Sequence, residues 1–310
     1  MYLVTGGAGF IGSNIVRECL ERGISVRILD NFSTGHWHNL EGIRSDVEIV
    51  EGDLRSYHLV QKAMRGVEVV LHQGALPSVP RSIDDPITTN EVNVQGTLNV
   101  LHAALDEGVR RVTFASSSSI YGNAPQQVKS EDLHVMPLSP YAVSKLAGEK
   151  YMQVFHSIYG LETVALRYFN VFGPWQDPDS PYSAVIPLFA RAYMEGRAPT
   201  INGDGEQSRD FTYVANVVHA NLLAAEAADA TVGHYPGTKP PAVLEARLGP
   251  LDWSSFGGRG YRLLRAVHAR TSGVSGPKGE TPDRVEMAGA RYEAVYLRAR
   301  ARLSGAMHTA

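Results

Sequence analysis

Short apolar and β-branched runs alternate with longer stretches of helical periodicity through the first 170 residues of the chain. This alternation is typical of βαβ units, in which parallel strands form a sheet and helices cover its faces. The predicted strands cover residues 2–5, 25–30, 47–50, 67–72, 112–116 and 163–167. Helical patterns between them cover residues 11–22, 56–65, 89–107 and 140–159. We therefore expect an α/β protein with a doubly wound parallel sheet.

The composition is that of an ordinary globular protein. The chain has 310 residues, of which 44% are hydrophobic and 20% are charged. A chain of this length can bury the core of one large domain or two modest ones, which excludes fibrous, disordered and disulfide-stapled classes. The net charge of -3 gives no reason to expect a nucleic-acid partner.

The single cysteine and the start of the chain bear on its location. Cys19 cannot form an internal disulfide, which fits a reducing compartment. The first residues lack the basic leader of a signal peptide, and no apolar run approaches the roughly 20 residues of a membrane span. We therefore expect a cytoplasmic protein with no membrane partner.

A glycine motif follows the first predicted strand. Gly6, Gly9 and Gly12 are spaced as G-x-x-G-x-x-G, and a helical pattern comes next. Glycine lets the backbone approach a pyrophosphate closely, and a helix N-terminus offers free N–H groups and a positive dipole end. Asp30 ends the second strand, and its carboxylate can accept both adenosine ribose hydroxyls but would repel a 2′-phosphate. The motif favours NAD over NADP; the alternative is a tight turn that binds no ligand.

A second motif, YAVSK, begins at Tyr141 and follows a serine and a proline that suit the first turn of a helix. Tyr141 and Lys145 therefore share one helix face. A phenol has an ordinary pKa of about 10, so a tyrosine base needs a nearby cation, which Lys145 would supply. Upstream, a serine run at residues 116–119 ends a strand, and one of its hydroxyls would hold the substrate oxygen that loses a proton. The alternative is an ordinary polar loop.

Taken in order, these motifs resemble the extended short-chain dehydrogenase/reductase superfamily, and within it the nucleotide-sugar 4-epimerases. The resemblance covers residues 1–231. It also rests on DNFSTG at 30–35, GDL at 52–54, HQGA at 72–75, NVQGT at 93–97, LRYFNVFGP at 166–174 and SRDF at 208–211. It implies a Rossmann fold, in which the doubly wound parallel sheet is joined by a small C-terminal substrate-binding subdomain.

The resemblance further implies a division of the chain and a set of partners. Residues 1–170 would form the NAD-binding domain, to which residues 203–231 return. Residues 171–202 and 232–310 would form the substrate-binding part. The cofactor would be NAD, the substrate a UDP-sugar, and the protein a homodimer.

Individual roles follow from the same resemblance. Tyr141 matches the family's base, Lys145 would hold the nicotinamide ribose, and Ser117 would orient the substrate. The residues expected to contact NAD are Gly6, Gly9, Phe10, Ile11, Gly12, Asp30, Asn31, Ser33, Thr34, Gly35, Asp53, Leu54, Gln73, Gly74, Ala75, Leu76, Asn93, Ser116, Tyr141, Lys145 and Tyr168. The residues expected to bind the UDP-sugar are Ser78, Ser117, Ser118, Asn170, Ala184, Val185, Ile186, Asn202 and Arg209.

The serine run narrows the expected reaction. Related dehydratases and decarboxylases carry a glutamate there, where this chain has Ser118 and Ser119. The missing carboxylate favours C4 epimerisation without dehydration. Tyr141 would remove the C4 hydroxyl proton, hydride would pass to NAD, and after the 4-keto sugar turns the hydride would return to its other face. Residues 76–83 and 182–187 are most similar to enzymes acting on UDP-N-acetylglucosamine, while UDP-glucose and UDP-glucuronate stay open.

Two other patterns carry no chemistry of their own. His36 and His38 lack a third convergent ligand, so we expect no metal site. Tyr151, Phe155 and Tyr159 recur at helical spacing, which indicates a helix face packed on the core or on a second subunit.

The composition changes near residue 232. Residues 232–310 hold 12 Lys and Arg against 6 Asp and Glu, contain no Ile, Asn or Gln, and lack the later motifs of the family. One hypothesis is a shift of reading frame near residue 232, and the other is a divergent half of the substrate domain. A frame shift would leave the sugar site incomplete, so a catalytically idle NAD-binding protein stays open as the alternative function.

Overall fold

The computed structural model describes residues 1–126, 129–131, 133–177, 185–201, 211–227 and 243–245. The chain divides into two compact units. One unit comprises Met1–Val171 and Thr212–Arg247, and the other comprises Phe172–Phe211 and Leu248–Ala310.

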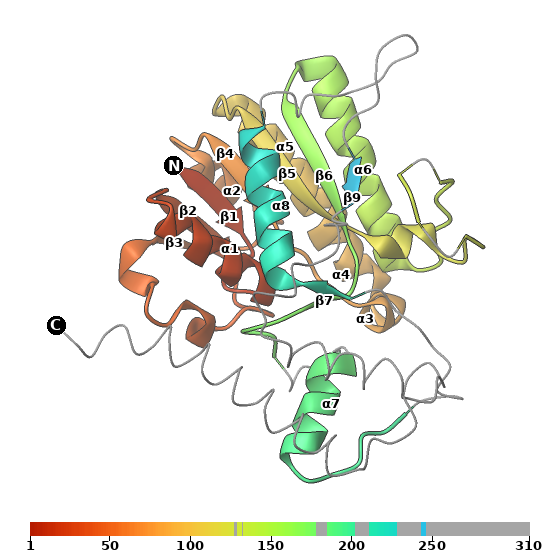
Figure 1. Ribbon diagram of the computed structural model, residues 1–310. Coiled ribbons are helices and arrows are strands. Elements are labelled where there is room, and N and C mark those ends of the chain that lie inside the picture. Colours follow the sequence, from red (N-terminus) through yellow and green to blue (C-terminus); the bar gives the residue numbers. More distant parts are fainter. Residues whose placement is uncertain (127–128, 132, 178–184, 202–210, 228–242, 246–310) are drawn as a thin grey trace, which may run out of the picture. The chain divides into compact units, whose positions relative to one another are not determined.

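The larger unit is built on one parallel sheet (Figure 1). Its strands are β1 (Tyr2–Thr5), β2 (Val26–Asp30), β3 (Glu48–Glu51), β4 (Val69–His72), β5 (Arg111–Ser117), β6 (Glu162–Tyr168) and β9 (Val243–Glu245). Their order is β3-β2-β1-β4-β5-β6-β9, so the chain reverses its direction of growth between β1 and β4. Ligands of doubly wound sheets bind at the carboxyl ends of the strands beside this reversal. The predicted Rossmann sheet is confirmed, and its first six strands lie within two residues of their predicted bounds.

Helices cover both faces of this sheet (Figure 1). On one face, α1 (Phe10–Glu21) packs against α8 (Val214–Glu226) over an apolar layer that includes Ile15, Ile28 and Leu222. On the other face, α2 (Tyr57–Met64), α5 (Gly96–Asp106) and α6 (Pro140–Tyr159) cover a second layer that includes Leu101 and Phe114. The two layers are each continuous, which is why the sheet strands read as nearly unbroken apolar runs.

The helix expected over residues 89–107 is present, but it starts earlier and is not regular throughout. The structure has α3 (Val79–Asp84), α4 (Pro86–Asn90) and a π-helical turn, Glu91–Gln95, before α5 begins. The Thr97 hydroxyl donates to the carbonyl of Asn93 at 2.6 Å, which gives that carbonyl a side-chain partner where the helix is widened. Single π-helical turns are frequent at functional sites, because they re-aim a side chain that a regular helix would point elsewhere.

The bounds of α6 follow from its terminal residues. Ser139 caps its start, since the Ser139 hydroxyl accepts from the N–H of Ala142 at 3.2 Å. Gly160 ends it with φ +73°, a left-handed conformation that favours glycine. Along the helix, Phe155 is buried in the core and Tyr159 is mostly exposed. Of this row of aromatic residues, Phe155 therefore packs on the core of the protein.

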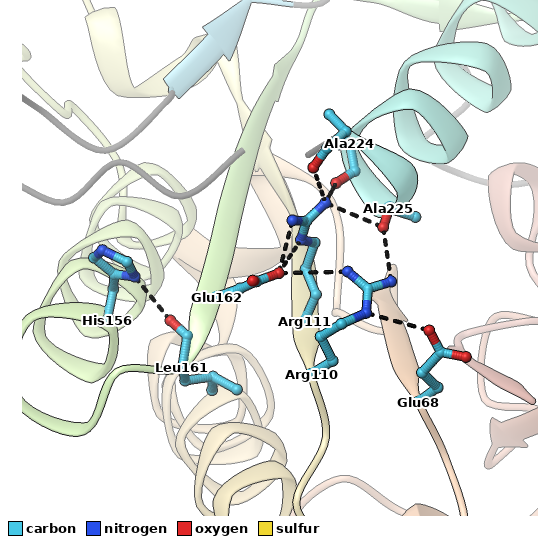
Figure 2. A network of polar contacts seen from close by, with 9 residues as sticks. Glu68, Arg110, Arg111, His156, Leu161, Glu162, Ala224 and Ala225 are labelled. Atoms are coloured by element: carbon cyan, nitrogen blue, oxygen red, sulfur yellow. Dashed lines mark hydrogen bonds and ion pairs between the residues drawn. The ribbon is translucent and has the colours of Figure 1, made fainter. Parts of the chain in front are cut away.

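At the amino end of the sheet, a polar network joins β5, β6 and the end of α8 (Figure 2). The buried Arg111 pairs with Glu162 at 2.7 Å and donates to the carbonyls of Ala224 at 2.9 Å and Ala225 at 3.1 Å. Arg110 donates to the same Ala225 carbonyl and pairs with Glu68. The last carbonyls of a helix lack partners within it and carry its negative dipole end, so Arg111 anchors α8 to the sheet.

The remaining elements are short. A two-stranded sheet joins β7 (Val171–Phe172) and β8 (Thr212–Tyr213), and α7 (Val185–Met194) is the described helix of the smaller unit. Turns of 3₁₀ helix lie at Trp37–Leu40, Arg44–Asp46 and Ser118–Tyr121. None of the described helices combines the length and apolarity that crossing a bilayer requires. The described residues also contain no group of three His, Cys, Asp or Glu that could hold a metal ion.

Candidate active site

The turn between β1 and α1 is shaped for close backbone approach. Gly6 has φ +67°, and a Cβ there would lie 2.8 Å from the backbone of Gly74. A Cβ on Gly12 would lie 2.1 Å from the carbonyl oxygen of Gly6. Helix α1 starts at Phe10, and its capping residue, Gly9, has no side chain to occupy the first N–H groups. The turn thus offers free backbone donors and a positive dipole end at the carboxyl edge of the sheet.

Asp30 ends β2 beside this turn. Its carboxylate is buried and accepts from the N–H of Ala8 at 2.9 Å and from the N–H of Phe32 at 2.8 Å. Burial raises the pKa of this carboxyl, and the two backbone donors act in the opposite direction. The carboxylate is therefore fixed in position, and the backbone bonds still leave lone pairs for further donors.

A polar cluster continues from Asp30 toward β3. The side chain of Asn31 donates to Asp53 at 2.9 Å, and Arg55 pairs with the same carboxylate at 2.9 Å. The Arg55 guanidinium holds the pKa of Asp53 at about 2. Behind the cluster, Asn99 of α5 donates to the carbonyl of Leu54 at 2.8 Å. These contacts hold together three of the residues predicted to contact NAD, namely Asn31, Asp53 and Leu54.

The segment after β4 carries four more predicted cofactor residues, Gln73 to Leu76. Asn93, on the π-helical turn, holds Leu76 by both main-chain groups, since it accepts from the N–H at 2.8 Å and donates to the carbonyl at 3.1 Å. Gln73 donates to Asn221 of α8 at 3.0 Å and accepts from the Tyr168 hydroxyl at 3.0 Å. The segment is therefore tied to helices on both faces of the sheet.

Tyr141 and Lys145 lie one turn apart at the start of α6. The Lys145 ammonium is buried, donates to the carbonyl of Ala115 at 2.8 Å and lies 5.0 Å from the centre of the Phe114 ring. Among the described residues it forms no ion pair, and burial lowers its pKa to about 7. Buried cations are stable only with compensating oxygens, so this ammonium suits a ligand that presents hydroxyl groups.

The phenol of Tyr141 meets the end of β5. Burial raises the pKa of Tyr141, and a hydrogen bond with the hydroxyl of Ser117 acts in the opposite direction. The Ser117 hydroxyl also accepts from the N–H of Ser119 at 3.2 Å, which fixes it at the start of the following 3₁₀ turn. The three residues predicted to be catalytic, Tyr141, Lys145 and Ser117, are thus brought together by α6 and β5.

Ser116, by contrast, turns away from the predicted catalytic group. Its hydroxyl donates to Glu149 of α6 at 2.5 Å, and Glu149 forms a buried pair with Arg167 of β6 at 2.8 Å. Arg167 also donates to the hydroxyl of Tyr121 at 2.9 Å. This buried network fixes the carboxyl ends of β5 and β6 against α6.

The predicted sugar-binding residues are distributed over both units. In the larger unit, Ser78 adopts φ +98°, a strained conformation for a residue with a side chain, and starts α3. Ser118 lies in the 3₁₀ turn after Ser117, and Asn170 accepts from the N–H of Thr212 at 3.1 Å. In the smaller unit, Val185 and Ile186 begin α7. The predictions for Ala184, Asn202 and Arg209 lie outside the described residues.

Comparison with known proteins identifies the family. The model of the NAD dependent epimerase/dehydratase family matches residues 2–235. The chain belongs to this family. The match ends close to residue 232, where the composition changes.

Members of the epimerase/dehydratase family with different activities resemble the chain. A UDP-glucose 4-epimerase of Mycolicibacterium smegmatis is 40% identical over 230 residues, which span 72% of this chain and 72% of the relative. A UDP-N-acetyl-alpha-D-glucosaminuronate decarboxylase of Bacillus cytotoxicus is 34% identical over 229 residues, 72% of this chain and 70% of the relative. A structure of UDP-N-acetylglucosamine 4-epimerase from Methanobrevibacter ruminantium M1 with UDP-N-acetylmuramic acid has a TM-score of 0.73 and 33% identity, covering 96% of this chain and 98% of that one.

The residues present fit the NAD that the family requires. The turn at Gly6 and Gly12 has no room for a Cβ, as close approach of a pyrophosphate to the backbone demands. The fixed carboxylate of Asp30 suits ribose hydroxyls, and the Lys145 ammonium lacks an anionic partner among the described residues. These features fit the expectation that Asp30 would hold the adenosine ribose and Lys145 the nicotinamide ribose.

Several residues that organise this epimerase-family site were not predicted from the sequence. They are His72, Thr97, Asn99, Ser144, Glu149, Arg167 and Asn221, all of them buried polar side chains. One signal was available for Glu149, which lies four residues after Lys145 and so on the same helix face. For Asn221, an amide that shares a helix face with Val217, Val218 and Leu222 is also a signal of a buried hydrogen bond.

Proposed function

We propose that the chain catalyses C4 epimerisation of a UDP-hexose through a 4-keto intermediate. The observation that carries this proposal is the placement of Tyr141 at the start of α6, with the Lys145 ammonium 5.9 Å from the centre of its ring and Ser117 at the end of β5. A phenol that faces the same sugar oxygen as a hydroxyl can exchange a proton with that oxygen while the hydroxyl holds it. The nearby cation favours the phenolate, which is the form that accepts the proton.

Each residue then has a stated task. Ser117 orients the C4 oxygen, Tyr141 takes its proton, and Lys145 stabilises the phenolate while binding the cofactor ribose. When bound, NAD supplies a reversible acceptor for the hydride of C4. After the 4-keto sugar has rotated to present its other face and the hydride has returned to C4, Tyr141 returns the proton to the C4 oxygen.

The residues after Ser117 support epimerisation over elimination or decarboxylation. Ser118 and Ser119 carry hydroxyls, and the buried Ser119 hydroxyl has no hydrogen-bond partner among the described residues. No carboxylate of that turn can therefore act as a second acid or base. Epimerisation must be distinguished from decarboxylation and dehydration, because relatives of the chain in this family include a decarboxylase.

The substrate is proposed as UDP-N-acetylglucosamine, UDP-glucose or UDP-glucuronate, each with its 4-epimer. The test is to incubate the purified chain, without added cofactor, with each UDP-sugar separately and to separate the products by chromatography. Formation of one 4-epimer supports the proposal and names the substrate. Formation of a dehydrated or decarboxylated sugar would assign the chain to another branch of the family.

A second candidate is an idle NAD-binding protein, and the observation that favours it is the abrupt composition change near residue 232, where the family match also ends. Resequencing the gene tests its cause. A reading-frame shift predicts that translation of another frame beyond codon 232 restores family motifs. If neither alternative frame does so, the shift is excluded and residues 232–310 are a divergent half of the substrate domain.

We also propose that the chain forms a homodimer through α6. Val143, Val154 and Ile158 are exposed apolar residues on one stripe of this helix, with spacings of 11 and 4 residues. Ile87 of α4, a helix that packs against α6, is also an exposed apolar residue. Light scattering should give twice the monomer mass for the full chain. The double variant Val154→Lys, Ile158→Lys should give the monomer mass.

A further inference from the structure

A line of buried polar groups runs beneath the cofactor turn, from β1 across β4 to α5. The N–H of Gly74 donates to the hydroxyl of Thr5 at 3.0 Å, and this hydroxyl lies 2.6 Å from Nδ1 of His72. On the other side of the ring, Nε2 of His72 lies 3.0 Å from the hydroxyl of Thr97. The Thr97 hydroxyl donates to the carbonyl of Asn93 at 2.6 Å. The three side chains of this line, those of Thr5, His72 and Thr97, are buried.

The contacts fix where the proton of His72 lies. Because Thr97 uses its only hydroxyl proton on the Asn93 carbonyl, it can only accept from the imidazole, so Nε2 carries the hydrogen. In a neutral ring Nδ1 is then an acceptor, and the Thr5 hydroxyl donates to it. The N–H of Gly74 fills a lone pair of Thr5, which leaves the Thr5 proton free for the ring. Every donor in the line therefore points the same way.

The surroundings keep His72 neutral. Its ring lies 5.7 Å from the ring of Phe114, and the Lys145 ammonium lies 5.0 Å from the same Phe114 ring. Burial, with the nearby Lys145 charge as a smaller cause, lowers the pKa of His72 to about 3. A second cation at this place would be unpaired and would lie close to the Lys145 charge.

The line continues from Asn93 into the helix of the proposed base. The side chain of Asn93 donates to the hydroxyl of Ser144 at 3.0 Å, and this hydroxyl donates to the carbonyl of Tyr141 at 2.8 Å. The same side chain holds both main-chain groups of Leu76. One connected set of hydrogen bonds thus joins the turn at Gly74 to the helical turn of Tyr141.

We propose that His72 is a positioning residue. As the neutral Nε2–H tautomer it holds the glycine turn and the Asn93 turn in register, so that the backbone around the NAD site and the first turn of α6 are fixed together. This assignment concerns the site of the proposed function, but it rests on NAD binding alone and not on the identity of the sugar.

The tautomer is tested directly by nitrogen NMR of the ring signals in the full chain. The chain has 11 histidines, and the His72 signal is the one missing from the spectrum of His72→Asn. We expect a protonated Nε2 and an unprotonated Nδ1 at pH 7. An imidazolium ring, or a ring protonated at Nδ1, would overturn the assignment without any reference to catalysis.

The positioning role is tested by NADH titration of three threonine variants. Thr97→Val keeps the shape and removes the hydroxyl that joins His72 to Asn93, whereas Thr97→Ser keeps the hydroxyl. Thr163→Val is the matched control, because Thr163 is equally buried and donates to the carbonyl of Met152 at 2.9 Å, outside the line. Thermal unfolding of each variant is recorded beside the NADH Kd.

We expect Thr97→Val to raise the NADH Kd about tenfold, which is about 1.4 kcal/mol of binding free energy. Thr97→Ser and Thr163→Val should stay within about twofold of the original chain. A purely structural role predicts that Thr97→Val and Thr163→Val lower the unfolding temperature alike and leave the NADH Kd unchanged. That result would overturn the proposal, whereas failure of sugar turnover would bear only on the proposed function.

Discussion

The ammonium of Lys145 lies 5.9 Å from the centre of the Tyr141 ring, one helical turn further along α6. The phenol of Tyr141 is therefore next to a cation whose own pKa is lowered by burial to about 7. Since α6 is capped by Ser139 and starts with a proline, the local sequence favours the helical first turn that carries Tyr141. A nearby cation such as Lys145 would stabilise the phenolate of Tyr141. The buried Lys145 ammonium would in turn be stabilised by an oxygen ligand.

Removal of the Tyr141 hydroxyl should separate binding from chemistry. We predict that Tyr141→Phe still contains NAD after purification, because the ring and the helix are unchanged. Its epimerisation rate should fall by about 10² to 10⁴, the usual contribution of a positioned acid or base. Tyr159→Phe, on the exposed end of the same helix, is the control and should keep full activity. Undiminished turnover in Tyr141→Phe would remove this residue from the mechanism.

The pKa of Lys145 predicts how NADH binding depends on pH. Above about pH 7 the free chain loses the Lys145 proton, so binding through the ammonium must take a proton up and the NADH Kd rises, by about tenfold per pH unit at most. Fluorescence titration from about pH 6 to pH 9 measures this rise. In Lys145→Met the Kd should be weaker and nearly constant over the same range. A pH-independent Kd in the unsubstituted chain contradicts the assignment.

The folding stability of the cofactor-free chain should show the opposite pH trend. The folded chain releases the Lys145 proton near pH 7, whereas the unfolded chain keeps it up to the ordinary pKa of 10.5. The unfolded state therefore binds more protons between these values, and stability rises with pH in that window. Comparison of denaturant midpoints for the original chain and Lys145→Met isolates this contribution from other titrating groups.

Gly148 allows α6 to approach β5. A Cβ at this position would lie 2.4 Å from the ring of Phe114, on which Lys145 also rests. Gly148→Ala should therefore destabilise the chain by about 1–3 kcal/mol and lower kcat, because the helix must move away from Ser117. Gly66→Ala is the control: its φ of +70° makes alanine strained, but nothing lies within 4 Å and no site residue depends on it. Equal loss of kcat in both variants would mean that the loss reflects unfolding alone.

Arg111 makes a contrasting prediction for the opposite edge of the sheet (Figure 2). Arg111→Met should cost about 3–5 kcal/mol of unfolding free energy, because Glu162 and the α8 carbonyls lose a buried partner. Arg110→Met, whose guanidinium is more exposed, should cost no more than about 1 kcal/mol. Both should leave the NADH Kd unchanged, since this network lies at the amino ends of the strands. A raised Kd in folded Arg111→Met would show that α8 transmits changes to the site.

Much of the fold could be predicted from the sequence, because hydrophobic periodicity, capping residues, proline and glycine determine each element locally. The bounds of α6, 140–159, follow from its capping serine, its proline and the glycine that ends it. In the same way, the glycine turn marks the end of β1 and Asp30 marks the end of β2. The π-helical turn at Glu91–Gln95 could not be predicted, since it depends on tertiary contacts made by Asn93 and Thr97.

Site residues that belong to a short sequence motif could be predicted. Site residues whose role depends on contact with a side chain far away in the sequence could not. Tyr141, Lys145 and Ser117 belong to short motifs, and the structure brings them together. His72 and Asn221 were missed because their roles depend on partners 67 and 53 residues away, Thr5 and Tyr168. For Ser116 and Tyr168 the motif gave the position but not the direction, as both hydroxyls bond within the protein.

The central claim is that one carbon atom, C4 of a UDP-hexose, is oxidised and reduced again in the same site. The most direct measurement uses UDP-sugars deuterated at C4, incubated with the full chain in ordinary water and without added NAD, with products identified by mass spectrometry. We predict a 4-epimer that keeps its deuterium, because the hydride leaves and returns within one bound state. A product that has lost deuterium to solvent, or no epimer from any of the three UDP-sugars while NAD is still released on denaturation, would contradict it.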